Sequence, residues 1–67
     1  MVRLKLLRLN KKLSQRALGE RAKVNASYIC NAESRGMILY PNQAERVASA
    51  LGWDGDPMEL FEEVEIA

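Results

Sequence analysis

Helix-start residues recur at short intervals along this sequence and leave room only for short helices. Ser14 and Asn25 each precede helix-forming residues, and a side-chain oxygen at such a position accepts a free backbone N–H of the first turn. Pro41 suits the first position of another helix, because the N–H that it lacks would have no partner there. The run Asp56–Glu59 combines a capping aspartate, a proline and a glutamate three residues after the cap.

The spacing of apolar residues predicts a helix after each of these signals and one before them. Leu18 and Ala22, for example, are four residues apart and therefore lie on one helical face. Gly36 and Gly52 are typical of residues that follow a helix. We predict an all-α fold, a single domain over residues 1–67, with five short helices at about 2–11, 15–22, 26–34, 41–51 and 57–63. Residues 64–66 alternate and fit either a strand or a frayed tail.

The chain is small and has few of the usual aids to stability. A domain of 67 residues buries only about 60% of the surface that its unfolded chain exposes. One cysteine without any histidine makes neither an internal disulfide nor a zinc site. A partner chain is the remaining common aid.

Several classes of protein are poorly supported. Charges recur up to Lys12, which is unlike a signal peptide, and the uncharged stretches 24–32 and 36–44 are shorter than the roughly 18 apolar residues of a membrane span. We therefore expect a cytoplasmic protein without a membrane partner. Cys30 has no imidazole to act as its base. We expect no enzyme activity and no cofactor, metal or small-molecule ligand.

The net charge of +1 conceals a strong polarity along the chain. Residues 1–36 carry nine basic and two acidic groups, whereas residues 37–67 carry one basic and seven acidic groups. The first half therefore has a charge of +7 and the second half −6. A basic half of this kind is typical of a surface that attracts phosphate. The acidic half either keeps the protein soluble or forms a surface for a partner.

Residues 13–33 have the layout of a helix-turn-helix, two short capped helices joined by a few residues. Such helices cross closely, and Gly19 and Ala22 are small enough for that crossing. Three apolar residues hold the pair to the domain: Leu18, Val24 and Ile29. The start of the second helix stays free for the major groove, and its residues are small or polar.

The stretch from Arg3 to Trp53 resembles the Cro/repressor-type, or xenobiotic-response-element-type, helix-turn-helix family. The resemblance is carried by L-S-Q at 13–15, a small residue at 19, Y-I at 28–29, Glu33, and V-A-S-A-L-G at 47–52. It implies a lambda-repressor-like DNA-binding domain, a fold whose DNA docking is a standard example of major-groove recognition.

The resemblance also implies roles for individual residues. Gln15 matches a residue that touches a DNA phosphate, and Asn25, Ala26, Ser27 and Asn31 match positions of the recognition helix that face DNA. From their chemistry we expect Ser27 and Asn31 to meet base edges and Ala26 to touch a thymine methyl. The ring of Tyr28 either packs on the domain or faces DNA. The full set of expected DNA contacts is Lys12, Gln15, Arg16, Asn25, Ala26, Ser27, Tyr28, Asn31 and Arg35. Arg8 and Glu33 match a charged pair that ties the first helix to the recognition helix.

The sequence departs from the family pattern at three places. Lys23 stands where the turn usually has glycine, and a left-handed lysine is strained by roughly 1 kcal/mol. Arg35 stands where glycine often follows the recognition helix, with Gly36 one place later. The segment 37–39 is apolar instead of basic, so it either covers the core or meets another protein. Phosphate contact there then falls to Arg35 and the hydroxyl of Tyr40.

These features together predict a transcriptional regulator that binds double-stranded DNA through residues 26–34. A single small domain buries little surface on DNA, so we expect a homodimer, with Met58, Leu60 and Phe61 as candidate contacts. The alternative is a protein-interaction or antitoxin-like module that keeps the fold without strong DNA binding. The apolar segment 37–39 and the acidic C-terminal segment favour that alternative.

Overall fold

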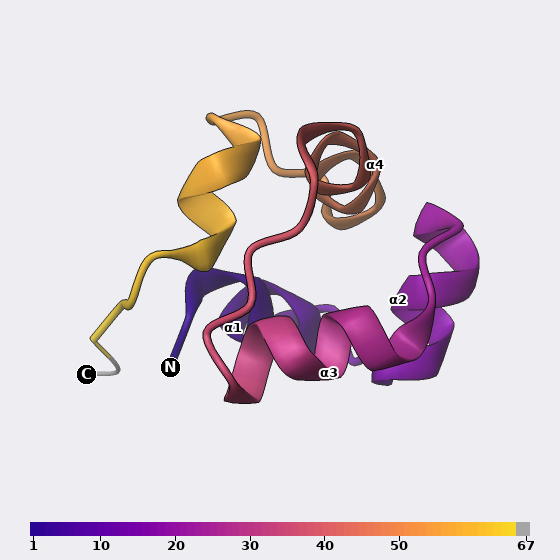
Figure 1. Cartoon of the computed structure of the whole chain (residues 1–67), viewed down its shortest axis with the longest axis horizontal. Coiled ribbons are helices and arrows are strands. Elements are labelled where there is room, and N and C mark those ends of the chain that lie inside the picture. The colour runs from indigo at the N-terminus through magenta and orange to yellow at the C-terminus, as the bar shows by residue number, and fades with distance from the viewer. Residues whose placement is uncertain (66–67) are drawn as a thin grey trace.

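The computed structural model describes residues 1–65 and shows four α-helices followed by a short 3-10 helix. They are α1 (Arg3–Asn10), α2 (Gln15–Ala22), α3 (Ala26–Ser34), α4 (Pro41–Leu51) and η1 (Pro57–Phe61). In Figure 1, α3 runs along one side with α2 at its end, while α4 and η1 lie across the opposite side. No strand longer than a single bridge occurs in these residues, so the all-α prediction is confirmed. None of the described helices combines the length and apolar character that crossing a bilayer requires.

The helices begin where the capping residues predict. The Ser14 hydroxyl accepts the backbone N–H of Ala17 at 2.9 Å, and the side-chain oxygen Oδ1 of Asn25 accepts that of Ser27 at 2.9 Å. The side chain of Asp56 likewise accepts a backbone N–H in the first turn of η1. Each of these bonds satisfies a donor that has no partner within its helix, which explains why the helix starts are readable in the sequence.

The fifth helix is shorter and tighter than the predicted 57–63, because the chain beyond it pairs with the N-terminal residues. After Phe61 the backbone becomes extended, and Glu63 forms an antiparallel bridge with Val2. The N–H of Val64 donates to the carbonyl of Met1 at 2.9 Å. Residues 62 and 63 therefore contribute to a pairing distant in sequence. The predicted alternation at 64–66 lies partly outside the described residues.

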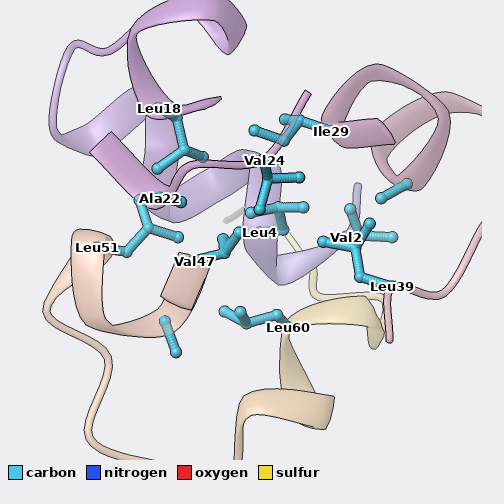
Figure 2. Packing of buried hydrophobic residues seen from close by; sticks show 12 residues of the cluster. Val2, Leu4, Leu18, Ala22, Val24, Ile29, Leu39, Val47, Leu51 and Leu60 are labelled. Atoms are coloured by element: carbon cyan, nitrogen blue, oxygen red, sulfur yellow. The ribbon is translucent and has the colours of Figure 1, made fainter. Parts of the chain in front are cut away.

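The core gathers apolar side chains from every helix (Figure 2). Its largest fully buried members are Leu4, Leu18, Ile29, Leu39, Leu60 and Val47. Leu60 is 0% exposed, so the expectation that it contributes to a dimer surface is wrong. Phe61 is half-buried against the core, and of the three candidates only Met58 is exposed.

Trp53 packs at the edge of this core, after the end of α4. Its indole Nε1 donates to the backbone carbonyl of Asp56 at 3.0 Å. The guanidinium of Arg3 lies 5.1 Å from the centre of the ring, within the range of a cation–π interaction. Arg3 also donates to the backbone carbonyl of Glu59 at 2.9 Å. These contacts hold η1 against α1 and the end of α4.

Candidate nucleic-acid interface

Helices α2 and α3 are joined by a turn of three residues and approach each other closely. The N–H of Val24 donates to the carbonyl of Gly19 at 2.9 Å. A Cβ atom on Gly19 would lie 2.6 Å from the carbonyl oxygen of Val24, closer than real Cβ atoms come to another atom. The absence of a side chain at Gly19 is therefore what allows the turn to fold back over α2.

The turn also places Lys23 in the left-handed conformation, with φ 57° and ψ 44°. Arg46 of α4 binds the backbone of this turn. Its Nε donates to the carbonyl of Ala22 at 2.9 Å, and its Nη2 donates to the carbonyl of Lys23 at 3.4 Å. These carbonyls end α2 and have no partner within it. The sequence alone does not reveal this role of Arg46; its one signal is that it is the only basic residue in the acidic half.

An ion pair with little exposure ties α1 to the last turn of α3. Nε and Nη2 of Arg8 donate to Glu33 Oε2 and Oε1 at 2.7 and 2.9 Å, with the two side chains 10% and 2% exposed. Arg8 Nη1 also donates to the carbonyl of Leu13 at 2.7 Å. Hydrogen bonding to Glu33 raises the pKa of Arg8 above its ordinary value, against the opposing effect of burial. This is the pair that the family resemblance implies.

Gln15 brings the start of α2 beside the same pair. Its amide Nε2 donates to Glu33 Oε1 at 3.1 Å, and within residues 1–65 its second amide N–H and its side-chain oxygen make no hydrogen bond. This contact sets the first residue of α2 next to the end of α3. The predicted contacts Lys12 and Arg16 flank Gln15 in sequence and are exposed. Arg16 lines a shallow hollow of the surface together with Asn25 and Ala26, so it lies beside the start of α3.

The outward face of α3 is polar and free of core residues. Ile29 and Ala32 are buried, whereas Ser27 and Tyr28 are exposed and Asn31 is half-exposed. Within the described residues, the side-chain amide of Asn31 makes no hydrogen bond. Tyr28 is 41% exposed, so its ring is not part of the core. Half-buried Ala26 lies at the start of the helix, next to the turn.

Asn25 and Ser27 are linked in a way that fixes their chemistry. Asn25 Oδ1 accepts both the backbone N–H of Ser27 at 2.9 Å and its hydroxyl at 3.0 Å. The hydroxyl proton of Ser27 is thus used within the protein, which leaves its oxygen as an acceptor. Asn25 keeps its amide N–H groups as donors. The expected base contact at Ser27 is accordingly one with a base N–H.

Not every cation of the basic half is available at this face. Arg3 binds the backbone of η1, and Arg8 is buried in its ion pair. The ammonium group of Lys11 lies beside Gly52 at the C-terminal end of α4, 3.7 Å from the position that a Cβ atom on Gly52 would take. Arg16 pairs with Glu20 at 3.3 Å, but both side chains are largely exposed, and such pairs contribute little. The exposed cations that remain include Lys12, Arg16 and Arg35, the three predicted to contact DNA.

Comparison with known proteins gives no match to this chain among family models, curated proteins or solved structures. The interpretation of this surface therefore depends on its residues and their geometry.

Proposed function

We propose that the protein is a sequence-specific, double-stranded DNA-binding regulator with a lambda-repressor-like arrangement, and that α3 enters the major groove. The observation that carries the proposal is the outward face of α3, which is polar, without core residues and anchored at its end by the Arg8–Glu33 pair. A rigidly held helix with such a face is what a helix-turn-helix presents to base edges.

The roles follow from the hydrogen-bonding groups that remain free. The amide of Asn31 has a donor and an acceptor side by side, which matches N7 and N6–H of adenine. The Ser27 oxygen accepts from a base amino group, and the methyl of Ala26 fits a thymine methyl. Lys12, Arg16 and the free N–H of Gln15 lie at the start of α2, where they meet phosphate oxygens.

A salt series on mixed-sequence duplex DNA tests the proposal most simply. A logarithmic plot of affinity against salt concentration has a slope of about −0.9 for each phosphate that the protein neutralises. We expect a slope of several phosphates. An absence of binding at low salt would refute DNA recognition as the function.

Two matched substitutions separate base contact from phosphate contact. Asn31→Ala changes the preference at one base position by about 1–3 kcal/mol, as measured by selection from a random DNA pool. Lys12→Ala weakens all sequences alike and lowers the salt slope by about 1. If both variants weaken every sequence equally, Asn31 does not contact a base.

One observation favours a second candidate function, a protein-interaction module. Ile38 and Tyr40 are 61% and 72% exposed, which is unusual for large apolar side chains in a small domain. The same salt series distinguishes the two, because an interaction module without a DNA role shows no salt-dependent affinity for DNA.

A further inference from the structure

A basic hollow of about 440 Å³ lies between the C-terminal end of α2 and the exposed side of α4. Three cationic side chains line it: Arg21 from α2, Lys23 from the turn that follows, and Arg46 from α4. The rest of its lining is neutral and consists of Ala22, Ser49 and Ala50. The hollow therefore brings three positive charges together without a carboxylate among its lining residues.

No acidic partner offsets these charges from nearby. The ion pairs among residues 1–65 involve neither Arg21 nor Lys23. The acidic residues next to this cluster in sequence are Glu20 and Glu45; neither lines the hollow, and Glu20 pairs with Arg16 instead. Cations gathered around one concave surface repel one another and raise the local concentration of anions. A bound anion would remove that repulsion.

The guanidinium of Arg46 is held in a fixed orientation at this hollow. Its Nε and Nη2 donate to the carbonyls of Ala22 and Lys23 at 2.9 and 3.4 Å. Because the group is planar, these two bonds fix its plane, and within residues 1–65 both N–H groups of Nη1 and one of Nη2 make no hydrogen bond. Two such N–H groups side by side match two oxygens of a phosphate. The same bonds occupy carbonyls that would otherwise repel an anion at this end of α2.

The backbone of Lys23 gives a second indication. Its left-handed conformation, with φ 57° and ψ 44°, is one that glycine adopts without strain and lysine does not. Residues held in such conformations cluster at binding sites, where the use of the side chain offsets the strain. The exposed ammonium of Lys23 lines the hollow, so the strained residue is also a cation of this cluster.

We propose that this hollow binds a phosphate group, with Arg46 as the oriented donor and Arg21 and Lys23 as flanking cations. A phosphate ester carries nearly two negative charges and three strong acceptor oxygens, which suits three converging cations better than a carboxylate with one charge. The hydroxyl of Ser49, which makes no hydrogen bond within the described residues, adds a neutral donor. The sequence alone does not show this site, because its cations come from two helices more than twenty positions apart.

The site lies away from the proposed DNA surface. In Figure 1 the C-terminal end of α2 lies toward α4, whereas α3 runs along the opposite side. The predicted phosphate contact Gln15 is at the start of α2, seven helical steps or about 10 Å from Ala22. The phosphate group can therefore belong to a free phosphorylated molecule or to a DNA backbone that extends past α2. The proposal does not depend on DNA binding.

Titration with inorganic phosphate, without DNA and at constant ionic strength, tests the site. We expect saturating shifts of the nuclear magnetic resonance signals of the Arg46 Nε–H and of residues 21–23, with a dissociation constant on the order of 1 mM, which is within reach of a ligand of five heavy atoms. Acetate should bind at least about fivefold more weakly, because it carries half the charge. Shifts that grow without saturation, or that spread evenly over the protein, would overturn the proposal.

Matched variants show whether the cluster itself binds. Lys23→Gln and Arg21→Gln should each raise the dissociation constant at least about fivefold, because each removes a unit charge a few Å from a dianion. Lys11→Gln makes the same change of charge at an exposed lysine outside the hollow and should leave the constant unchanged. Equal constants for Lys23→Gln and Lys11→Gln would overturn the proposal. The backbone signals of each variant show at the outset that it is folded.

A salt series on duplex DNA distinguishes the two sources of the phosphate. If the DNA backbone occupies the hollow, Arg21→Gln lowers the logarithmic salt slope by about 1 relative to the unmodified protein. If a free phosphorylated molecule is the ligand, the slope is unchanged while the loss of inorganic phosphate binding remains. A protein that binds phosphate but no DNA at low salt would refute the proposed function and leave this site established.

Discussion

Substitution of Arg8 by methionine removes the cation from the pair that joins α1 to α3. Methionine keeps much of the length and volume of the side chain, so the change is mainly one of charge and hydrogen bonding. Glu33, 2% exposed, loses both guanidinium donors, and the carbonyl of Leu13 loses its side-chain donor. Gln15 remains as a neutral donor to Glu33, and one amide N–H does not balance a buried carboxylate.

The expected loss is large relative to the stability of a chain this size. Breaking a buried pair by removing one partner costs about 3–5 kcal/mol. A domain of 67 residues has roughly 3–10 kcal/mol of unfolding free energy in total. At about 4–8 °C for each kcal/mol, Tm falls by at least about 12 °C, or the variant is unfolded at room temperature. Thermal unfolding followed by far-ultraviolet circular dichroism measures this change.

The chain offers a matched control in its exposed pair. Arg16→Met breaks an arginine–glutamate pair whose side chains are 87% and 70% exposed, so we expect a change within about 0.5 kcal/mol. The double variant Arg8→Met with Glu33→Leu removes both buried charges and should recover most of the lost stability. Equal Tm values for Arg8→Met and Arg16→Met would refute the argument from burial.

The pH dependence of this effect has a definite sign. Because the pKa of Arg8 is raised in the folded state, its contribution is fully present below the pKa of the unfolded state and is lost only as pH rises through the folded value. Both values lie well above neutrality. The stability deficit of Arg8→Met should therefore be the same at about pH 7 and about pH 9.

Two further substitutions test the turn between α2 and α3. Lys23→Gly should raise the unfolding free energy by about 0.5–1 kcal/mol, because glycine relieves the left-handed strain. The gain is smaller than the full strain, because glycine also raises the entropy of the unfolded chain. An unchanged denaturation midpoint would show that Lys23 carries no strain. Gly19→Ala should lower it by about 1–3 kcal/mol, because the new Cβ meets the carbonyl of Val24 at 2.6 Å. A neutral result in urea denaturation would mean that the turn moves aside easily.

The helix bounds were predictable where local chemistry decides them. Ser14 and Asn25 cap α2 and α3 through hydrogen bonds to residues at most three positions away, so the local sequence is enough to predict them. The C-terminal end of the last helix was not predictable, because residues 62 and 63 pair with the N-terminal residues some sixty positions away. The capping residue Asp56 indicates where this helix begins, but it carries no information about the pairing that ends it. The 3-10 form of η1 was missed for the same reason.

The candidate interface shows the same division. The Arg8–Glu33 pair was expected from a family pattern, and its geometry follows that pattern. Arg46 was not expected, since its contacts with the carbonyls of Ala22 and Lys23 depend on how α4 crosses α2. The sequence allowed two roles for the apolar segment 37–39, covering the core or meeting another protein. In the structure Leu39 lies in the core, whereas Ile38 is exposed to solvent. Sequence spacing does not determine that alternation.

The contacts of Trp53 give the protein a built-in optical reporter. It is the only tryptophan of the chain, and it directly follows Gly52, the residue that caps the C-terminal end of α4. Its emission depends on the Arg3 guanidinium over its ring and on the indole hydrogen bond to Asp56, contacts with α1 and with the N-cap of η1 that are lost on unfolding. Neither of these contacts involves α3, so the fluorescence of Trp53 reports folding from a part of the protein other than the outward face of α3.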